Sequence, residues 1–178
     1  MKESSRVVYY TEMDSKIGPL TIAATNKGVC WIDFGKIEDT LYYLQRWAKR
    51  WINTEQVVFA QNELDDVKRQ LHEYFNRDRK EFDLDVDLYG TPFQKLVWES
   101  LLMIPYGEVR TYKDIAIQIN SPQSVRAIGG ANHNNPVPII VPCHRVIGSN
   151  GNLVGYGGGI EIKKILLELE GYKLGENN

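Results

Sequence analysis

The chain has 178 residues, of which 43% are hydrophobic and 25% are charged, and its net charge at neutral pH is −2. This composition excludes a disordered, collagen-like or coiled-coil chain, two cysteines exclude a disulfide framework, and the charge alone does not favour nucleic acid as a partner. No apolar run approaches the ~20 residues of a membrane helix, and the first residues hold no apolar signal core, so we expect a cytoplasmic protein that does not bind a membrane.

A change in amino-acid composition near residue 90 predicts two domains, residues 1–89 and residues 90–178. Dense charge runs precede this point, whereas Pro and Gly separate short apolar segments after it. The first part holds 13 Lys and Arg against 16 Asp and Glu, a net charge of −3, and the second holds 8 against 7, a net charge of +1. The acidity therefore belongs to the first part of the chain.

The first half is predicted to form strands and then helices. Three β-rich runs, at residues 7–11, 20–23 and 29–34, are separated by turn signals and predict an antiparallel meander. Helical periodicity follows over residues 39–50 and 62–76, and strict alternation over residues 82–88 predicts a further strand. We expect Cys30 to be a small buried side chain in a strand and His72 to be a solvated helix residue.

Three short helices are predicted at the start of the second half. Capping boxes begin at Thr91, with Pro92 at the first helical position, and at Thr111, and a third helix runs from Gln123 to about Asn132. The last two helices, joined by a tight turn, form either a helix-turn-helix or a plain helical hairpin.

Small residues follow Arg126 in the third of these helices. Glycine inside a helix costs about 1 kcal/mol relative to alanine, so glycine here indicates the close approach of another group. That group is either a neighbouring helix or a nucleic-acid groove, with Arg126 as the nearest strong cation. The small residues are Ala127, Gly129, Gly130 and Ala131.

The most reactive group in the sequence is Cys143, which follows a rigid apolar segment. A thiol is nucleophilic as its thiolate, and the adjacent His144 and Arg145 could supply a base and a positive charge. A carboxylate would be needed to orient the imidazole, and Glu170, in a helix predicted over residues 161–170, is a candidate. The alternative is a buried cysteine beside a hydrogen-bonded histidine.

Other features of the second half set limits on its chemistry. No second Cys or His stands at ligand spacing from Cys143, so we expect no metal and no cofactor. The glycine loop at residues 155–159 lacks the pattern of a phosphate loop and indicates a flexible loop near a pocket, or a turn. The last helix is predicted to bury one apolar side, made of Ile162, Ile165, Leu166 and Leu169.

Together these motifs resemble the O6-alkylguanine-DNA alkyltransferase family. The run Pro142-Cys143-His144-Arg145-Val146, preceded by Asn135-Pro136-Val137-Pro138, is similar to the family's active-site signature. Tyr112, Arg126, the loop at Tyr156 and Leu169-Glu170-Gly171 follow in the family's order. The resemblance is close over residues 91–172 and loose before them. It implies an α+β protein, with a ribonuclease-H-like α/β N-terminal domain built on an antiparallel sheet and a mostly helical, winged helix-turn-helix C-terminal domain.

The resemblance implies DNA repair by direct reversal of damage. An O6-alkylguanine, or an O4-alkylthymine, is flipped out of double-stranded DNA, and its alkyl group passes irreversibly to Cys143 in a single turnover. His144 would act as base, Glu170 would hold its tautomer, and Tyr112 would donate a proton to the leaving base. Asn135 would lock the turn between the recognition helix and the active site.

The same resemblance implies a substrate pocket and a DNA surface on a monomeric protein. Arg126 would fill the place of the flipped base, and Gly157 stands where many relatives carry Ser, which leaves a roomier pocket. His133 stands where a basic residue often helps to hold the DNA backbone. The implied pocket residues are Pro138, Val146, Tyr156, Gly157 and Gly158. The other implied DNA-binding residues are Tyr112, Ala127, Gly129, Gly130 and Ala131.

Two rival functions remain open at this point. A non-enzymatic protein that binds alkylated bases and recruits other repair factors would lack the cysteine, whereas this chain has Cys143. A helix-turn-helix regulator of transcription would need a dimerisation segment, for which the sequence gives no signal.

Overall fold

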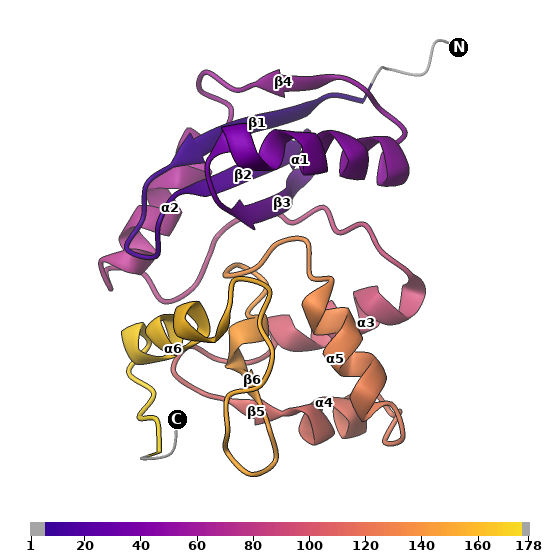
Figure 1. Cartoon of the computed structure of the whole chain (residues 1–178), viewed down its shortest axis with the longest axis vertical. Helices are drawn as coiled ribbons and strands as arrows, with labels where there is room; N and C mark the ends of the chain where they lie inside the picture. Colours follow the sequence, from indigo (N-terminus) through magenta and orange to yellow (C-terminus); the bar gives the residue numbers. More distant parts are fainter. Residues whose placement is uncertain (1–5, 176–178) are drawn as a thin grey trace. The chain divides into compact units, whose positions relative to one another are not determined.

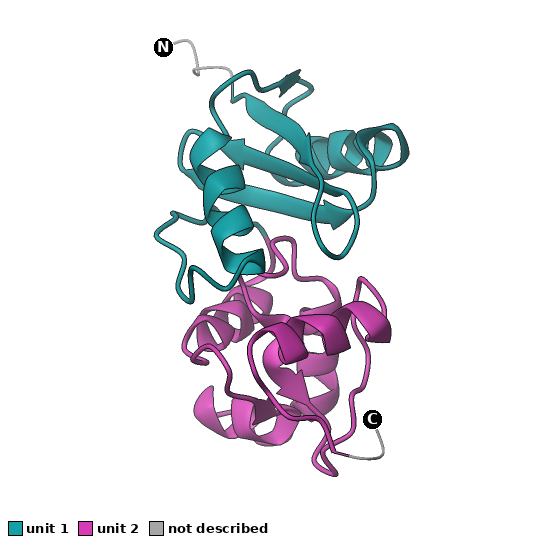
Figure 2. Cartoon of the chain, turned by 90° about the vertical axis from the view of Figure 1, so that its left-hand side faces the viewer, with its two compact units in different colours: residues 1–89 teal, residues 90–178 magenta. Residues whose placement is uncertain are grey.

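The computed structural model describes residues 6–175 and divides the chain into two compact units, residues 1–89 and 90–178 (Figure 2). The predicted lack of a signal core concerns the first residues, of which residues 1–5 lie outside the described part. No helix within residues 6–175 is long and apolar enough to cross a membrane.

The first unit is built on a four-stranded sheet with the order β3-β2-β1-β4 (Figure 1). The meander predicted from the sequence is confirmed, with Tyr10 opposite Ala23 and Ile22 opposite Ile32 in antiparallel register. A short fourth strand, which the sequence does not predict, joins the edge of the sheet parallel to the first strand. The strands are β1 (Val8–Met13), β2 (Leu20–Thr25), β3 (Gly28–Phe34) and β4 (Val57–Phe59).

Two helices complete the first unit, α1 (Ile37–Trp51) and α2 (Asp65–Phe75). The helix α1 buries Leu44 and Ala48, four residues apart, in a core cluster shared with Cys30 of β3. Cys30 is fully buried and His72 is exposed, as the sequence predicts. This unit therefore places its free thiol in a packed core, where burial raises the pKa of Cys30 far above its ordinary value.

The prediction of a strand over residues 82–88 is wrong. Its pairing with β3 is a single bridge between Val86 and Val29. A side chain takes the place of a strand partner earlier in the segment, because Gln70 donates to the carbonyl of Asp83 at 2.9 Å and accepts from its N–H at 2.8 Å. The alternating pattern reflects half-buried packing, such as that of Phe82 against Tyr74, and not a ladder of strand hydrogen bonds.

The second unit is mostly helical, which confirms the α+β class predicted from the sequence. Both capping boxes are present, at Thr91 and Thr111, and the third helix begins at Val125, two residues later than predicted. The helices are α3 (Pro92–Leu102), α4 (Tyr112–Gln118), α5 (Val125–His133) and α6 (Ile160–Leu169). A 3-10 turn, η1 (Cys143–Arg145), leads into β6 (Val146–Ile147), which pairs parallel with β5 (Arg110–Thr111).

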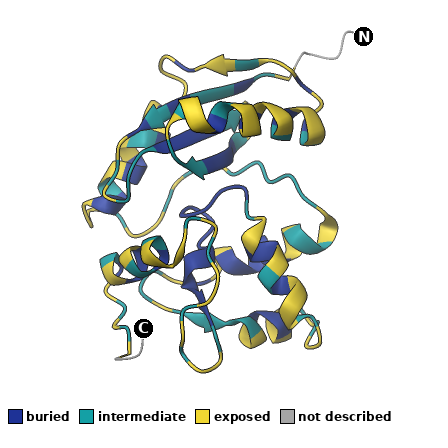
Figure 3. Ribbon diagram, viewed as in Figure 1, coloured by how far each residue is buried: buried dark blue, intermediate teal, exposed yellow. Residues whose placement is uncertain are grey.

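The core of this unit holds α5 in place and surrounds the segment that carries the cysteine. Trp98 of α3 is buried and donates from its indole nitrogen to the carbonyl of Ala131 at 2.9 Å. Every residue from Pro136 to Ile147 is buried (Figure 3). The reactive segment is therefore a rigid part of the core and not a surface loop.

The buried side predicted for the last helix is wrong at one position. Ile165 is 41% exposed, whereas Lys163 is fully buried with Leu166 and Leu167. Lys163 can enter the core because its ammonium group donates to the carbonyls of Val146, at 2.5 Å, and Val154, at 3.0 Å. Backbone oxygens thus replace the water that the charge loses on burial.

Candidate active site

Cys143 opens the turn η1 and is 5% exposed. Burial raises the pKa of the Cys143 thiol to about 11, although a hydrogen bond from Asn135 and the charge of Lys163 act in the opposite direction. The resting thiol is therefore protonated at neutral pH. It needs a base to become a nucleophile.

His144, the next residue, is bound to Glu170. The Nε2 atom of His144 lies 2.7 Å from Oε1 of Glu170, and both side chains are fully buried. Burial lowers the pKa of His144 below its ordinary value, while Glu170 acts to raise it. A neutral imidazole that donates from Nε2 to a carboxylate leaves Nδ1 as its basic atom. Within residues 6–175, Nδ1 has no hydrogen-bond partner.

Arg145 binds the same carboxylate. Its Nε and Nη2 atoms donate to the two oxygens of Glu170 at 2.8 and 2.9 Å, and its Nη1 donates to the carbonyl of Ile104 at 2.6 Å. Burial alone would raise the pKa of Glu170, but the hydrogen bonds from His144 and Arg145 hold it well below its ordinary value. Arg145 thus neutralises Glu170, and it is not the cation acting on the thiol that the sequence suggested.

That cation is Lys163, which sequence reasoning missed. Its position between apolar residues of α6 resembles that of any solvated lysine on an amphipathic helix, so no local signal marks it. Burial lowers the pKa of Lys163 to about 8, and the charge of a Cys143 thiolate would raise it. The two groups therefore stabilise each other's charged forms.

Asn135 fixes the turn between α5 and Cys143. Its Nδ2 donates to the carbonyl of Val141 at 2.9 Å, and its Oδ1 accepts from the N–H of Val137 at 3.0 Å. Inside this loop Ile139 has a φ of +76°, a conformation that a β-branched residue adopts only under constraint. The structure places Asn135 at the turn for which the sequence proposed it.

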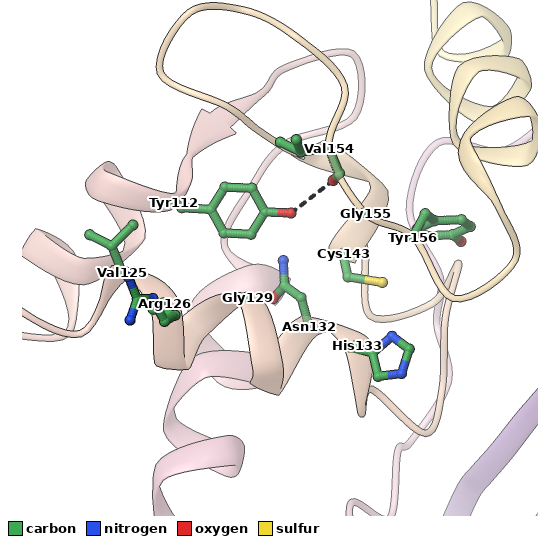
Figure 4. A pocket seen from close by; sticks show the side chains of 10 residues that line it. All are labelled: Tyr112, Val125, Arg126, Gly129, Asn132, His133, Cys143, Val154, Gly155 and Tyr156. Atoms are coloured by element: carbon green, nitrogen blue, oxygen red, sulfur yellow. Dashed lines mark hydrogen bonds between the residues drawn. The ribbon is translucent and has the colours of Figure 1, made fainter.

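A cavity of about 470 Å³ lies against Cys143 and α5 (Figure 4). Of the residues proposed from the sequence, it brings together Tyr112, Arg126, Gly129, Cys143 and Tyr156. Tyr112 donates from its hydroxyl to the carbonyl of Val154 at 3.1 Å (Figure 4). The remaining lining residues are Val125, Asn132, His133, Val154 and Gly155. Of these, the sequence had assigned a binding role only to His133, at the DNA backbone, and had placed Gly155 in a loop near a pocket or a turn.

Other residues proposed for the pocket do not line this cavity. Pro138 and Val146 are buried in the core segment around Cys143. Gly157 is exposed and Gly158 is half-buried, in the loop before α6. Pro138 and Val146 lie within the reactive segment and Gly157 and Gly158 follow Tyr156 in the chain, but the cavity wall is made by α5, Tyr112, Cys143 and the 154–156 segment.

Comparison with known proteins assigns both units. A model of the 6-O-methylguanine DNA methyltransferase DNA-binding domain matches residues 92–172, and a model of the ribonuclease-like domain of the same proteins matches residues 8–88. The chain belongs to the 6-O-methylguanine DNA methyltransferase family.

Relatives in this family are similar over nearly their whole length. The methylated-DNA–protein-cysteine methyltransferase of Methanosarcina barkeri is 44% identical over 96% of this chain and 99% of its own. The constitutive enzyme of that name from Bacillus subtilis is 45% identical over 91% of this chain and 94% of its own. A crystal structure of Mycobacterium tuberculosis OGT in complex with DNA matches with a TM-score of 0.78 and 42% identity, over 91% of this chain and 92% of that one.

The helix α5 of this methyltransferase family member has an open face beside the cavity. Arg126, Ala127 and Gly130 are exposed, whereas Ala131 is buried. A Cβ atom added at Gly129 or Gly130 would meet no described atom within 4 Å. The glycines are therefore not needed for packing against a neighbouring helix, which was one of the two explanations that the sequence left open.

The described residues contain no group of three His, Cys, Asp or Glu side chains placed to hold a metal ion.

Proposed function

We propose that this protein repairs alkylated DNA by moving the alkyl group of an O6-alkylguanine irreversibly to Cys143, once per molecule. The observation that carries the proposal is the buried thiol of Cys143 at the wall of a cavity, next to a histidine whose Nε2 is bound to Glu170. Membership of the methyltransferase family supports it. The target atom of a guanine is out of reach inside duplex DNA, so the base must enter the cavity flipped out of the stack.

The transfer begins with removal of the thiol proton. His144 accepts it at Nδ1, directly or through a water molecule, and the Cys143 sulfur attacks the alkyl carbon in line with the C–O6 bond. The S–C bond forms, the C–O6 bond breaks, and its electron pair stays with the guanine. Tyr112 donates a proton to the leaving base. The thioether is stable, which makes the reaction irreversible.

The charges around the site favour this step. Glu170 and Arg145 form an ion pair before the reaction, so the net charge of these two groups beside His144 is zero. When the proton moves, a thiolate and an imidazolium appear together, the first facing the charge of Lys163 and the second bound to Glu170. Groups that are fixed before the reaction stabilise the developing charge without reorganisation.

The face of α5 is proposed to bind double-stranded DNA. Arg126 at the mouth of the cavity would fill the place of the flipped base, and Ala127, Gly129 and Gly130 would let the helix approach the groove closely. The small net charge of the second half implies few phosphate contacts and a shallow dependence of affinity on salt. A monomer suffices for this interaction. O4-alkylthymine is a second candidate base of the same chemical type.

The pocket residues proposed from the sequence complete this assignment. Tyr156 lines the cavity. Pro138, Val146, Gly157 and Gly158 stand outside its lining, so on this proposal they act from behind the wall, by holding the segments that carry Cys143 and Tyr156. Asn135 would hold the turn that sets α5 against Cys143.

A mass measurement tests the proposal. The protein is mixed with a duplex oligonucleotide that contains one O6-methylguanine, and intact protein and peptides are weighed. The expected result is the mass of one methyl group on the peptide that holds Cys143. Cys143→Ala should bind the same duplex and gain no mass, while Cys30→Ala, at the other buried thiol, should react like the wild type. Wild-type protein that binds the duplex without gaining mass would be a non-enzymatic reader of damaged bases.

A further inference from the structure

Asn132, in the last turn of α5, is a polar side chain without an evident purpose in the fold. It is 9% exposed, and it lines the cavity together with Cys143 and Tyr112 (Figure 4). Neither its amide nitrogen nor its oxygen makes a hydrogen bond of ordinary geometry with the described residues. Buried amides are nearly always hydrogen-bonded, so an unpaired one at a cavity wall beside reacting groups is a candidate for a role in the reaction.

One polar group that the reaction uses and that the Asn132 side chain acts on is the Tyr112 hydroxyl. The amide nitrogen of Asn132 points toward that hydroxyl (Figure 4). Burial, the largest effect, raises the pKa of Tyr112, whereas the Asn132 side chain, acting as a hydrogen-bond donor toward the phenol, lowers it. An N–H group that faces a phenol oxygen stabilises the phenolate, and so makes the phenol a better proton donor.

The Tyr112 hydroxyl can leave its present acceptor, the carbonyl of Val154, without leaving that carbonyl unpaired. The hydroxyl donates to the carbonyl of Val154 at 3.1 Å, and the same carbonyl accepts from Nζ of Lys163 at 3.0 Å. If the hydroxyl turns away, Val154 keeps a donor. The Tyr112 oxygen, in contrast, has its proton free for the base and its lone pairs facing Asn132.

We propose that Asn132 is a positioning residue for the proton donation by Tyr112, an inference that rests on the proposed function. When a flipped base enters, the Tyr112 proton turns from Val154 to the base, and Nδ2–H of Asn132 donates to the Tyr112 oxygen. As the C–O6 bond breaks and its electron pair passes to the base, the Tyr112 O–H bond breaks and its proton moves to the base. The phenolate keeps the hydrogen bond from Asn132 until water returns a proton.

The first test is a double-mutant cycle on the rate of methyl transfer in a single turnover at saturating DNA. We expect Asn132→Leu, which has nearly the same shape and no donor, to react about tenfold more slowly. Tyr112→Phe should react roughly a hundredfold more slowly. Because Asn132 acts through Tyr112, the double variant should be no slower than Tyr112→Phe alone. Additive losses, or a wild-type rate in Asn132→Leu, would overturn the inference.

The second test separates this role from a structural one. Iodomethane alkylates a thiol and releases iodide, which needs no proton, so Asn132→Leu and the wild type should react with it at Cys143 at equal rates. A matching loss in both reactions would mean that Asn132 only supports the fold. Asn132→Asp, which ionised has no donor, should also slow transfer from DNA, and it provides a second variant if Asn132→Leu does not fold.

A neighbouring asparagine provides the matched control. Asn134 is exposed at the end of the same helix and donates to the carbonyl of Gly130 at 2.8 Å, outside the cavity lining. Asn134→Leu should keep the single-turnover rate at saturating DNA. If the wild type itself takes no methyl group from DNA while iodomethane still labels Cys143, the proposed function falls and this inference falls with it. Transfer by the wild type with no effect of Asn132 overturns the inference alone.

Discussion

The imidazole of His144 and the carboxylate of Glu170 are joined by a 2.7 Å contact in which both side chains are fully buried. A carboxylate in this position selects one tautomer of a histidine and stabilises the imidazolium that forms when the ring takes a proton. Arg145 binds both oxygens of the same carboxylate, so the negative charge is balanced before any reaction begins.

Glu170→Gln should therefore affect both catalysis and stability. The amide cannot stabilise an imidazolium as a carboxylate does, so we expect methyl transfer to slow by about 10²–10⁴-fold in single-turnover experiments. The buried Arg145 also loses its counter-charge, which should lower the free energy of unfolding in urea by about 3–5 kcal/mol. Glu161→Gln, at an exposed position of the same helix, is the control and should change neither quantity measurably. A wild-type rate in Glu170→Gln would mean that this carboxylate does not support the base.

The transfer rate and the stability should both fall in acid. The pKa values of His144 and Glu170 are lower in the folded protein than their ordinary values of 6.5 and 4.5. The unfolded chain thus binds more protons, and the stability that these groups contribute is complete above pH 6.5 and is lost as the pH falls through their folded pKa values. Transfer should persist somewhat below pH 6.5, because a neutral His144 is the base. Urea unfolding and single-turnover rates across pH 4–8 measure both, and the acid loss of stability should be smaller in Glu170→Gln.

Gly130→Ala should make the free protein more stable and its DNA complex weaker. The added methyl group meets no described atom within 4 Å, and alanine is the better helix former by about 1 kcal/mol. The free energy of unfolding should rise by up to that amount. On the proposed DNA face, the same methyl group should hold the helix away from the groove and lower the affinity for duplex DNA. Gln45→Ala, at an exposed and uncharged position of α1, should leave the affinity unchanged. Unchanged affinity in Gly130→Ala would place the DNA elsewhere.

Gly107→Ala should disturb the site from outside the cavity. Gly107 and Gly171 both adopt a left-handed conformation, with φ values of +79° and +82°, so alanine is strained at each by about 1 kcal/mol. At Gly107 the new Cβ would also lie 3.0 Å from the carbonyl oxygen of Glu170, whereas at Gly171 it meets nothing described within 4 Å. The N–H of Gly107 donates to Oε2 of Glu170 at 3.2 Å. We expect both variants to lose stability in urea and only Gly107→Ala to slow transfer. Equal rates would show that the turn does not act on Glu170.

Local chemistry made much of this molecule predictable. Thr91 and Thr111 carry their capping signals within four residues, and both helices begin where those signals stand. An oriented histidine needs a carboxylate, which made Glu170 one candidate partner of His144, and the family resemblance then implied that pairing.

Features that depend on distant partners were not predictable in this way. The backbone of Asp83 is paired by the side chain of Gln70, which no alternation pattern can reveal. The three residues of β4 are too few for a periodicity signal. Lys163 is buried because carbonyls from Val146 and Val154 converge on it, and Asn132 faces the cavity because of the packing of α5, so neither has a mark in the sequence around it.

The burial that keeps Cys143 protonated also has a chemical benefit at rest. Peroxides oxidise thiolates, and their attack follows both thiolate content and exposure. A thiol that is 5% exposed, with its pKa raised to about 11, offers little of either. On the proposed function each molecule is consumed by one reaction, so a sulfur lost to oxidation would waste the whole protein. The burial that makes His144 necessary as a base therefore also protects the unreacted Cys143 from oxidation until it meets its substrate.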